Sequence, residues 1–432
     1  MTTSFAIPRQ GELPESLTRL IESQDWEGLI QRLDAGMPAN LVALGDVALI
    51  EQVLMTLETF NRVPPSASVA PGPLPLLEAF LRHGLHPDGY YEGQSTAIAM
   101  VLNYGQWAWA HRLLDEGFPV EGPRGSVLLS LIDGRLQRAI AASPTLGLED
   151  EPLPPEILAD PGDDPSPGRD LAPETLAAEE GAVWGLQDET QEEREALTTL
   201  VRRLVAGGAD LERADQMDGD TKPAMSPLFL AIAHLDVAMI DSLLAAGANP
   251  TAAPPGWALR PIDWAVQRGS VAVVHALVRN GVPLEPNPSL PPGFDLEAHP
   301  LVRAAHLGRA ALFEPLAAGM TQSDLAFFGT MAMHKAAACG HVDCMQALRL
   351  LRIPFNAQSS LGTVPMHQAA RVGEEKVLGF LLRRGQKWDS PTNQQGETPK
   401  DTLLRFHPEL AGRFGLSLPD NVRPLFGRRS PR

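Results

Sequence analysis

Residues 330–341 read Thr-Met-Ala-Met-His-Lys-Ala-Ala-Ala-Cys-Gly-His, and residues 363–373 read Thr-Val-Pro-Met-His-Gln-Ala-Ala-Arg-Val-Gly. The two stretches, which both lie within residues 329–387, are copies of one pattern. His334 precedes His367 by 33 residues, and Gly340 precedes Gly373 by the same 33. A period of this length indicates a solenoid, in which one supersecondary unit is repeated along the chain.

Each part of the pattern has a structural role. Proline in the first helical turn, such as Pro365, loses no hydrogen bond and has its φ preset. Gly373 can end that helix in a left-handed conformation that other residues adopt less readily. Residues 375–384 then place apolar side chains at helical spacing, before Gly385 turns the chain. One such unit cannot bury its own apolar faces, so the pattern predicts that successive copies stack.

The pattern resembles the ankyrin repeat, whose consensus has Thr-Pro-Leu-His, then Ala-Ala, then Gly, then a Leu-Leu helix that ends in Gly-Ala. The matching residues are Pro365-Met366-His367, Ala369-Ala370, Gly373, Leu381-Leu382 and Gly385. The resemblance implies an all-α fold, a solenoid of stacked helix-turn-helix units with hairpin loops. It also implies that His334 and His367 act structurally, as hydrogen-bonding ties between repeats.

The resemblance is strong over residues 226–406, moderate over 92–117 and around Gly208, and weak elsewhere, and about nine or ten helix pairs are expected. Leu235 stands where the motif has its central glycine, and Ala97 and Ala332 replace the motif proline. We expect these units to be tilted or distorted. The predicted organisation comprises diverged ankyrin-like helical repeats (1–142), an acidic Pro/Gly-rich insertion expected to be disordered (143–172), an ankyrin-repeat domain (173–410) and a basic C-terminal tail (411–432).

The charge of the chain is unevenly distributed. The formal net charge is −18, and residues 149–195 hold sixteen Asp and Glu against two Arg. Nucleic acid is therefore not expected as a partner, because its phosphates require a basic face. The acidic insertion is interpreted either as a solvated loop or as a segment that steers a basic partner or guards the groove.

Cysteine use and hydropathy bear on the compartment. The two cysteines, Cys339 and Cys344, lie within one repeat and form no disulfide framework, which favours a reducing compartment. Residues 1–10 lack the pattern of a signal peptide, and no apolar run approaches the ~18 residues of a membrane-spanning helix. We expect a cytoplasmic protein, monomeric when free and without a membrane partner.

Two short stretches raise the question of metal binding. His83, His86 and Asp88 lie on one predicted hairpin and could bind a metal, although helix-end and turn roles account for the same residues. Residues 215–220, Asp-Gln-Met-Asp-Gly-Asp, faintly resemble a calcium loop but lack its spacing and its downstream Glu. The sequence has no Gly-x-Ser-x-Gly, phosphate-binding-loop or dinucleotide motif. We expect no cofactor, no resident metal and no catalytic residue, and hence no enzyme.

In ankyrin proteins the ligand usually meets the hairpin tips and the groove-facing side of the first helix. The resemblance therefore implies two groups of partner-binding residues. The helix positions just before the central glycine are Asn103, Tyr104, His234, Arg268, His306 and Arg371, with Ala233, Gln267, Leu307, Ala338, Cys339 and Val372 beside them. The hairpin positions are Trp257, Phe327, Phe328 and Gln394. Aromatic residues and arginine carry much of the energy of protein interfaces, whereas packing inside the repeats is the alternative role of these aromatic residues.

Three functions are considered. The first is a non-catalytic protein–protein interaction scaffold that binds a protein partner through the concave groove and hairpin tips. The second is a bacterial antidote or immunity-type inhibitor that masks a basic toxin or enzyme, suggested by the acidity and by a composition typical of GC-rich bacteria. The third, least supported, is a metal-dependent enzyme that uses His83, His86 and Asp88.

Overall fold

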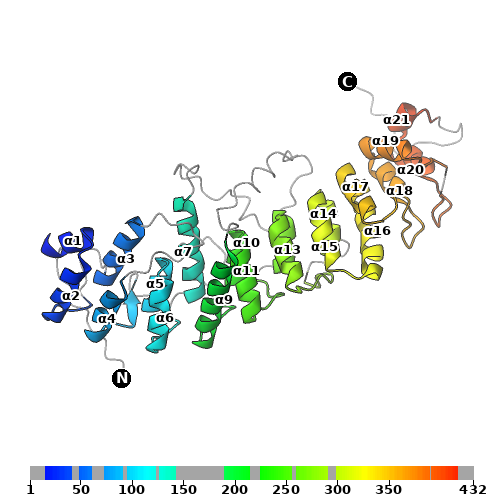
Figure 1. Cartoon of the computed structure of the whole chain (residues 1–432). Coiled ribbons are helices and arrows are strands. Elements are labelled where there is room, and N and C mark those ends of the chain that lie inside the picture. The colour runs from blue at the N-terminus through cyan, green and yellow to red at the C-terminus, as the bar shows by residue number, and fades with distance from the viewer. Residues whose placement is uncertain are drawn as a thin grey trace. The chain divides into compact units, whose positions relative to one another are not determined.

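The computed structural model describes residues 15–40, 48–60, 73–90, 95–122, 126–142, 189–214, 224–254, 259–289, 298–389 and 391–416. The chain divides into two compact units, unit 1 (1–257) and unit 2 (258–432), each described by itself. The predicted all-α fold of stacked helix pairs is confirmed (Figure 1). The predicted insertion (143–172) and the tail from residue 417 onward lie outside the described residues, so the predicted domain boundaries stay predictions.

Unit 1 consists of paired helices. They are α1 (Glu15–Glu22), α2 (Trp26–Asp34), α3 (Leu49–Phe60), α4 (Leu74–Arg82), α5 (Ala97–Asn103), α6 (Trp107–Asp115), α7 (Val127–Ala142), α9 (Gln191–Ala206), α10 (Pro227–Ala233) and α11 (Val237–Ala246). Strands β1 (Asp88–Tyr90) and β2 (Ser95–Thr96) pair antiparallel before α5. The inner helices α5, α7 and α10 pack in that order, and the outer helices α6, α9 and α11 do the same. Trp107 and Trp109 of α6 are buried.

Unit 2 repeats the same arrangement. Its helices are α12 (Pro261–Arg268), α13 (Val271–Arg279), α14 (Pro300–His306), η2 (Ala310–Leu312), α15 (Phe313–Ala318), α16 (Gln322–Ala338), α17 (Val342–Leu350), α18 (Pro365–Val372), α19 (Glu375–Arg383), α20 (Pro399–Phe406), α21 (Pro408–Ala411) and η3 (Gly412–Phe414). The inner helices α12, α14, α16, α18 and α20 pack on one another in this order. Small buried side chains such as Ala369 and Ala370 allow the helices to approach closely.

Local sequence sets both ends of the inner helices. Proline occupies the first turn of α10, α12, α14, α18 and α20. Gly269 and Gly373 follow α12 and α18 in the left-handed conformation, with φ of 83° and 88°. Leu235, which replaces the glycine after α10, keeps a left-handed φ of 57°. The repeat therefore retains its local geometry there, although a side chain in this conformation costs about 1–2 kcal/mol.

Helix α16 corrects the prediction that Phe327 and Phe328 lie in a hairpin. Both residues belong to this 17-residue helix, which begins at the N-cap Thr321. Ala332 stands where the motif has proline, so nothing interrupts the helix at this point. The Phe328 ring stacks on the His299 ring with 3.8 Å between centroids, whereas Phe327 is 63% exposed.

The two motif histidines tie neighbouring repeats together, as the resemblance implied. His334 Nε2 donates to the carbonyl oxygen of Ala357 at 2.9 Å, and His367 Nε2 donates to that of Glu397 at 3.1 Å. Burial lowers the pKa of both imidazoles and so favours the neutral form. Neutral imidazole suits this structural role.

A second contact between repeats lies over the central glycines of unit 2. A Cβ atom built on Gly269, Gly308, Gly340 or Gly373 would meet the side chain of Arg309, His341, Glu374 or His407 respectively, at 2.8–3.0 Å. Each of these four side chains precedes or begins the outer helix of the following repeat. His341 Nε2 and His407 Nε2 also donate to the carbonyl oxygens of His306 and Arg371, at 3.0 and 3.1 Å. Because each of these glycines has no side chain, a side chain of the next repeat can occupy the space above it.

In unit 1, helix α7 has a buried arginine at the position of this glycine. Arg135, with none of its side chain exposed, donates from Nε and Nη2 to the Asp236 carboxylate at 2.7 and 3.0 Å. Its Nη2 also donates to Glu189 Oε1 at 2.6 Å. Asp236 is in turn the N-cap of α11 and accepts from the Met239 amide. This ionic cluster links Arg135 of α7 to Glu189, which lies just before α9, and to Asp236 at the start of α11.

The neighbouring Gly134 allows α7 to cross the end of α5 closely. A Cβ atom at Gly134 would lie 2.4 Å from the Asn103 carbonyl oxygen and 2.7 Å from that of Leu102. Real Cβ atoms do not approach a backbone oxygen this closely. The glycine is therefore a packing requirement in the middle of a helix, where glycine is otherwise unfavourable.

Acid is expected to destabilise unit 2 through His299. Burial, with a smaller effect of the positive Arg260, lowers the pKa of His299 from 6.5 to about 4. Between these values the unfolded chain binds the proton and the folded chain does not, so stability is complete above pH ~6.5 and falls as the pH falls towards 4. The loss attributable to His299 is about 3 kcal/mol.

The H299N variant tests this pH dependence. Asparagine keeps an N-cap acceptor for α14, which His299 Nδ1 now provides to the Leu301 amide, but does not titrate. Urea unfolding at pH 7 and pH 4.5 should show a smaller loss of stability in the variant than in the wild type. Equal losses in the two proteins would assign the acid sensitivity to other groups.

Candidate partner-binding face

The accessible side chains of the inner helices of unit 2 recur in one register. In α14 the residues 303 and 306 are half-buried and the others are buried, and the C-cap residue 307 is half-buried as well. The three equivalent positions are accessible in the next two repeats, as residues 335, 338 and 339 at α16 and residues 368, 371 and 372 in α18. In α12 only the last two of the three positions, residues 267 and 268, are accessible. We call this set the inner face; its eleven residues are Gln267, Arg268, Arg303, His306, Leu307, Lys335, Ala338, Cys339, Gln368, Arg371 and Val372.

The inner face is basic, although the whole chain is strongly acidic. Four of its residues are Lys or Arg, and no Asp or Glu is among the eleven. Arg371 donates from Nε and Nη2 to Gln368 Oε1 at 3.2 and 3.0 Å, and Arg303 Nη1 donates to Gln267 Oε1 at 3.3 Å. Both acceptors are neutral side-chain amides, and the bonds orient the two guanidinium groups.

The borders of the inner face are mixed in charge. The side chains that cover the central glycines, Arg309, His341, Glu374 and His407, run along one edge. In the last repeat Arg405 forms an ion pair with Glu397, with Nη1 and Oε1 2.8 Å apart. Cys339 Sγ lies 3.7 Å from His306 Nδ1 within the face itself.

Exposed apolar side chains and a linked pair of hairpins accompany the basic residues. Phe327 and Leu361 are each 63% exposed, and Val372 is 45% exposed. Gln394 Nε2 donates to the Ser360 carbonyl oxygen at 2.8 Å, and the backbone N–H of Gln394 donates to the Leu361 carbonyl oxygen at 3.1 Å. The hairpin tips of two consecutive repeats are thereby joined, which holds Leu361 in place.

Unit 1 offers a different surface at the same register. Asn103 and Tyr104 follow this register at the end of α5, and His234 does so after α10; all three are half-buried. In α7 the equivalent position is the half-buried Asp133, and burial raises the pKa of this carboxyl to about 6. The equivalent residues of unit 1 are thus neutral or acidic, in contrast to unit 2.

The predicted binding residues are therefore divided between unit 1 and unit 2. Asn103, Tyr104 and His234 lie in unit 1, and Trp257 lies outside the described residues. The others lie in unit 2; they are Arg268, His306, Phe327, Phe328, Arg371 and Gln394. The sequence interpretation missed Arg303, Lys335 and Gln368. The signal was available, because residues three or four positions before the chosen ones share their side of a helix.

No metal centre takes shape in the described part of the chain. No three His, Cys, Asp or Glu side chains gather there as metal ligands. His83 Nε2 instead lies 2.8 Å from Asp34 Oδ1, and this hydrogen bond is the main cause that lowers the pKa of Asp34. The Asp88 side chain and residues 215–220 lie outside the described residues. None of the described helices is long and apolar enough to span a membrane.

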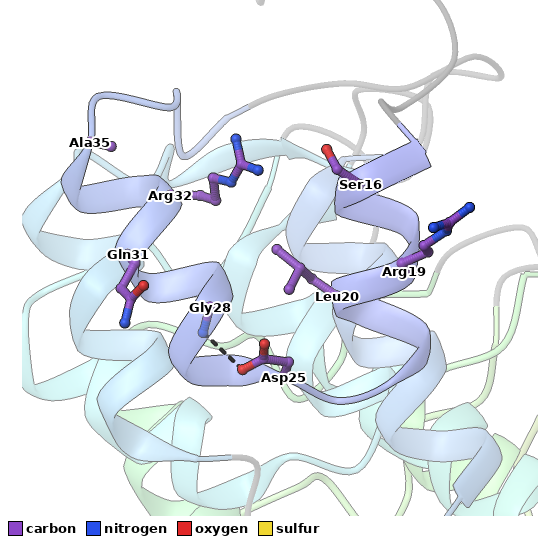
Figure 2. Close-up of a pocket in the computed structure, with 8 residues that line it drawn as sticks. All are labelled: Ser16, Arg19, Leu20, Asp25, Gly28, Gln31, Arg32 and Ala35. Atoms are coloured by element: carbon purple, nitrogen blue, oxygen red, sulfur yellow. Dashed lines mark hydrogen bonds between the residues drawn. The ribbon is translucent and has the colours of Figure 1, made fainter.

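A hollow lies between α1 and α2, as Figure 2 shows. Its lining residues are Ser16, Arg19, Leu20, Asp25, Gly28, Gln31, Arg32 and Ala35. Asp25 Oδ1 accepts from the Gly28 amide at 2.9 Å as the N-cap of α2, and Arg19 forms an ion pair with Glu15. These polar groups stabilise helix ends, and the hollow carries no functional assignment.

The motif positions now have their structural roles. Proline begins the inner helices, glycine ends them, and the histidines donate to the backbone of the following repeat. The fold is the ankyrin-repeat fold.

The comparisons with known proteins give distant likenesses to two solved structures. No family model and no curated protein matches the chain. The crystal structure of the human ASB11 ankyrin repeat domain is 23% identical, with a TM-score of 0.37, over 52% of this chain and 98% of that domain. The ankyrin repeat domain of Bcl-3, described as a unique member of the IkappaB protein family, is 22% identical, with a TM-score of 0.36, over 49% of this chain and 90% of that one.

Proposed function

We propose that this chain is a non-catalytic protein-interaction scaffold that binds a protein partner through the inner face of unit 2 and the adjacent hairpin tips. The observation that carries the proposal is the fixed register of the inner face. Four successive inner helices present accessible residues at equivalent positions, and in α12, α14 and α18 the other residues are buried. Such a surface is rigid, so little conformational entropy is lost when a partner binds to it.

The side chains on this surface suit protein recognition. Arginine and aromatic residues contribute disproportionately to interface energies, and Arg268, Arg371 and Phe327 are of these types. Phe327 is also far more exposed than an aromatic side chain needs to be in a repeat that is satisfied by its own packing. The hairpin link at Gln394 adds a second fixed surface beside it.

An affinity experiment with matched variants tests the scaffold function. The full chain is used as bait in a lysate of its native cell. It is compared with an inner-face variant (Q368A/R371A) and an outer-helix control (R349A/R383A), whose two arginines are also exposed. A partner retained by the wild type and the control should fall at least about tenfold in the inner-face variant. Equal recovery by all three proteins would refute binding through the inner face.

An antidote that masks a basic toxin or enzyme remains the second candidate. It is favoured by the sixteen acidic residues within 149–195, and such a partner would have to meet a surface other than the basic inner face. Co-expression with the product of a neighbouring toxin gene should rescue growth, and failure to rescue would dismiss this candidate. The cytoplasmic location and the monomeric state stay predictions.

A further inference from the structure

We infer that the N-terminal half of helix α16 is a docking site for an arginine-containing segment of a partner protein. The inference rests on the proposed scaffold function and adds a second contact surface to it. Pro365, the first residue of α18, is equivalent to Ala332 of α16, so residues 322–331 of α16 have no helical counterpart in α18. We call these residues the α16 extension. They are exposed or half-buried except for Leu325 and Gly329, which are buried.

An aromatic stack supports the exposed ring of Phe327. This ring meets the Phe328 ring edge-on, with 5.0 Å between the centroids and an interplanar angle of 84°. Phe328 in turn stacks on the ring of His299, which is only 3% exposed, so the stack is anchored in the interior of the repeat. Phe327 itself is 63% exposed. A supported ring of this kind loses little conformational freedom when a partner covers it.

A carboxylate lies one helical turn before this ring. Asp324 and Phe327 are three positions apart, so their side chains are neighbours on the helix surface. Asp324 Oδ2 accepts from Thr321 Oγ1 at 2.7 Å, and the backbone N–H of Asp324 donates to the same Oγ1 at 3.1 Å, which orients the carboxylate. Among the described residues Thr321 alone is hydrogen-bonded to this side chain, so Oδ1 can accept from a partner. Burial lowers the pKa of His299 and the Asp324 carboxylate acts in the opposite direction, which places this carboxylate near the aromatic stack.

An exposed aromatic ring beside a carboxylate is suited to arginine. A guanidinium group can lie over the Phe327 ring and donate to Asp324 Oδ1 at the same time, because its N–H donors lie at the edge of a flat cation. The formal net charge of −18 attracts a basic segment over a longer range. Lys335 follows Phe327 by eight residues, which is about 12 Å along the helix. This separation exceeds the screening length of about 8 Å at physiological salt, so Lys335 opposes the arginine only weakly.

The remainder of the α16 extension sets the next contact of the segment. Thr330 and Met331 are half-buried and lie one turn beyond Phe327, about 5–6 Å along the helix. In an extended segment, side chains two residues apart point to the same side and are about 7 Å apart. An arginine over Phe327 therefore brings the second residue after it to Met331, where an aliphatic side chain would be covered. The fit is to a segment of the type Arg-x-Leu.

The test measures binding of a labelled peptide, Ser-Gly-Arg-Ser-Leu-Gly-Ser, to the full chain by fluorescence anisotropy. The site variant is D324N/F327S, in which asparagine keeps an acceptor for Thr321. The matched control is D343N/L350S, which makes the same two changes at exposed residues of α17. The wild type and the control should bind alike, and the site variant should bind at least about tenfold more weakly. A peptide with citrulline, the neutral isostere, in place of arginine should also bind the wild type at least about tenfold more weakly.

Other results would overturn the inference in distinguishable ways. Equal binding by the site variant and the control would show that the peptide is attracted by net charge alone. Equal binding of the arginine and citrulline peptides would leave an apolar contact without recognition of a cation, and no binding to the wild type would remove the site. The bait experiment with Q368A/R371A reads the inner face and leaves the α16 extension unchanged. Loss of the partner in that variant, alongside a failed peptide test, would keep the scaffold function and remove only the docking site on α16.

Discussion

The D236A variant is expected to lower the free energy of unfolding of unit 1 by about 3–5 kcal/mol, because it strands the buried Arg135 without its bidentate partner. The Arg135 side chain is fully buried, and the Asp236 and Glu189 carboxylates are each 1% exposed. The variant also loses the N-cap acceptor of α11, which normally contributes about 1 kcal/mol. Hydrogen exchange of α7 and α11 in the full chain measures the effect where it arises.

Two further variants decide whether the buried charge causes the loss. The R413A variant breaks the exposed pair of Arg413 with Glu375, whose side chains are 66% and 47% exposed, and should cost at most about 1 kcal/mol. The triple variant R135M/E189Q/D236N removes all three charges and keeps a cap, so it should recover most of the stability lost in D236A. A loss below about 1 kcal/mol in D236A would contradict a desolvated ionic cluster.

The second large effect is expected from G134A. The added methyl group would collide with the backbone oxygens of Asn103 and Leu102, which cannot move away as a flexible side chain could. Helices α5 and α7 must therefore separate, and we expect a cost of at least about 3 kcal/mol, at the upper end of overpacking effects. Chemical denaturation monitored by the fluorescence of buried Trp107 and Trp109 in α6 reports on this part of unit 1.

Gly379 provides the matched control, since it is also a glycine within a helix. A Cβ atom there would meet only the end of the flexible Arg383 side chain, at 3.4 Å. The G379A variant should therefore gain up to about 1 kcal/mol from the higher helix propensity of alanine. If both alanine variants changed stability in the same direction, the close crossing of α5 and α7 would not be the reason for Gly134.

Much of the fold could be predicted from the sequence because its signals are local. Pro365 and Gly373 set the ends of α18 through their own backbone preferences, and the 33-residue period carries the glycine rule to Gly340 in the preceding repeat. The course of α16 was harder to predict. A missing proline at Ala332 permits the helix to continue, but whether it does depends on Phe328 packing against His299, which is a tertiary contact.

The candidate site was only partly predictable, for a related reason. Motif transfer places Arg268, His306 and Arg371 correctly on the inner helices of unit 2. Charge was counted along the chain, where the acidic residues of 149–195 outweigh everything else, and not over a folded surface. The basic inner face appears only when positions from four repeats are brought side by side. Arg135 was likewise hidden, because its partner Asp236 is 101 residues away in sequence.

The contact over the central glycines couples the sequence evolution of neighbouring repeats. Where an inner helix ends at Gly308 or Gly373, the following repeat carries a large side chain, His341 or His407, in the space above the glycine. At Arg135 the space is already filled, and the following repeat carries the shorter, oppositely charged Asp236. The two positions can therefore change only together, and related chains should show covariation between them. A single repeat duplicated or deleted beside α7 would bring mismatched residues into contact, so such events should have involved both repeats at once.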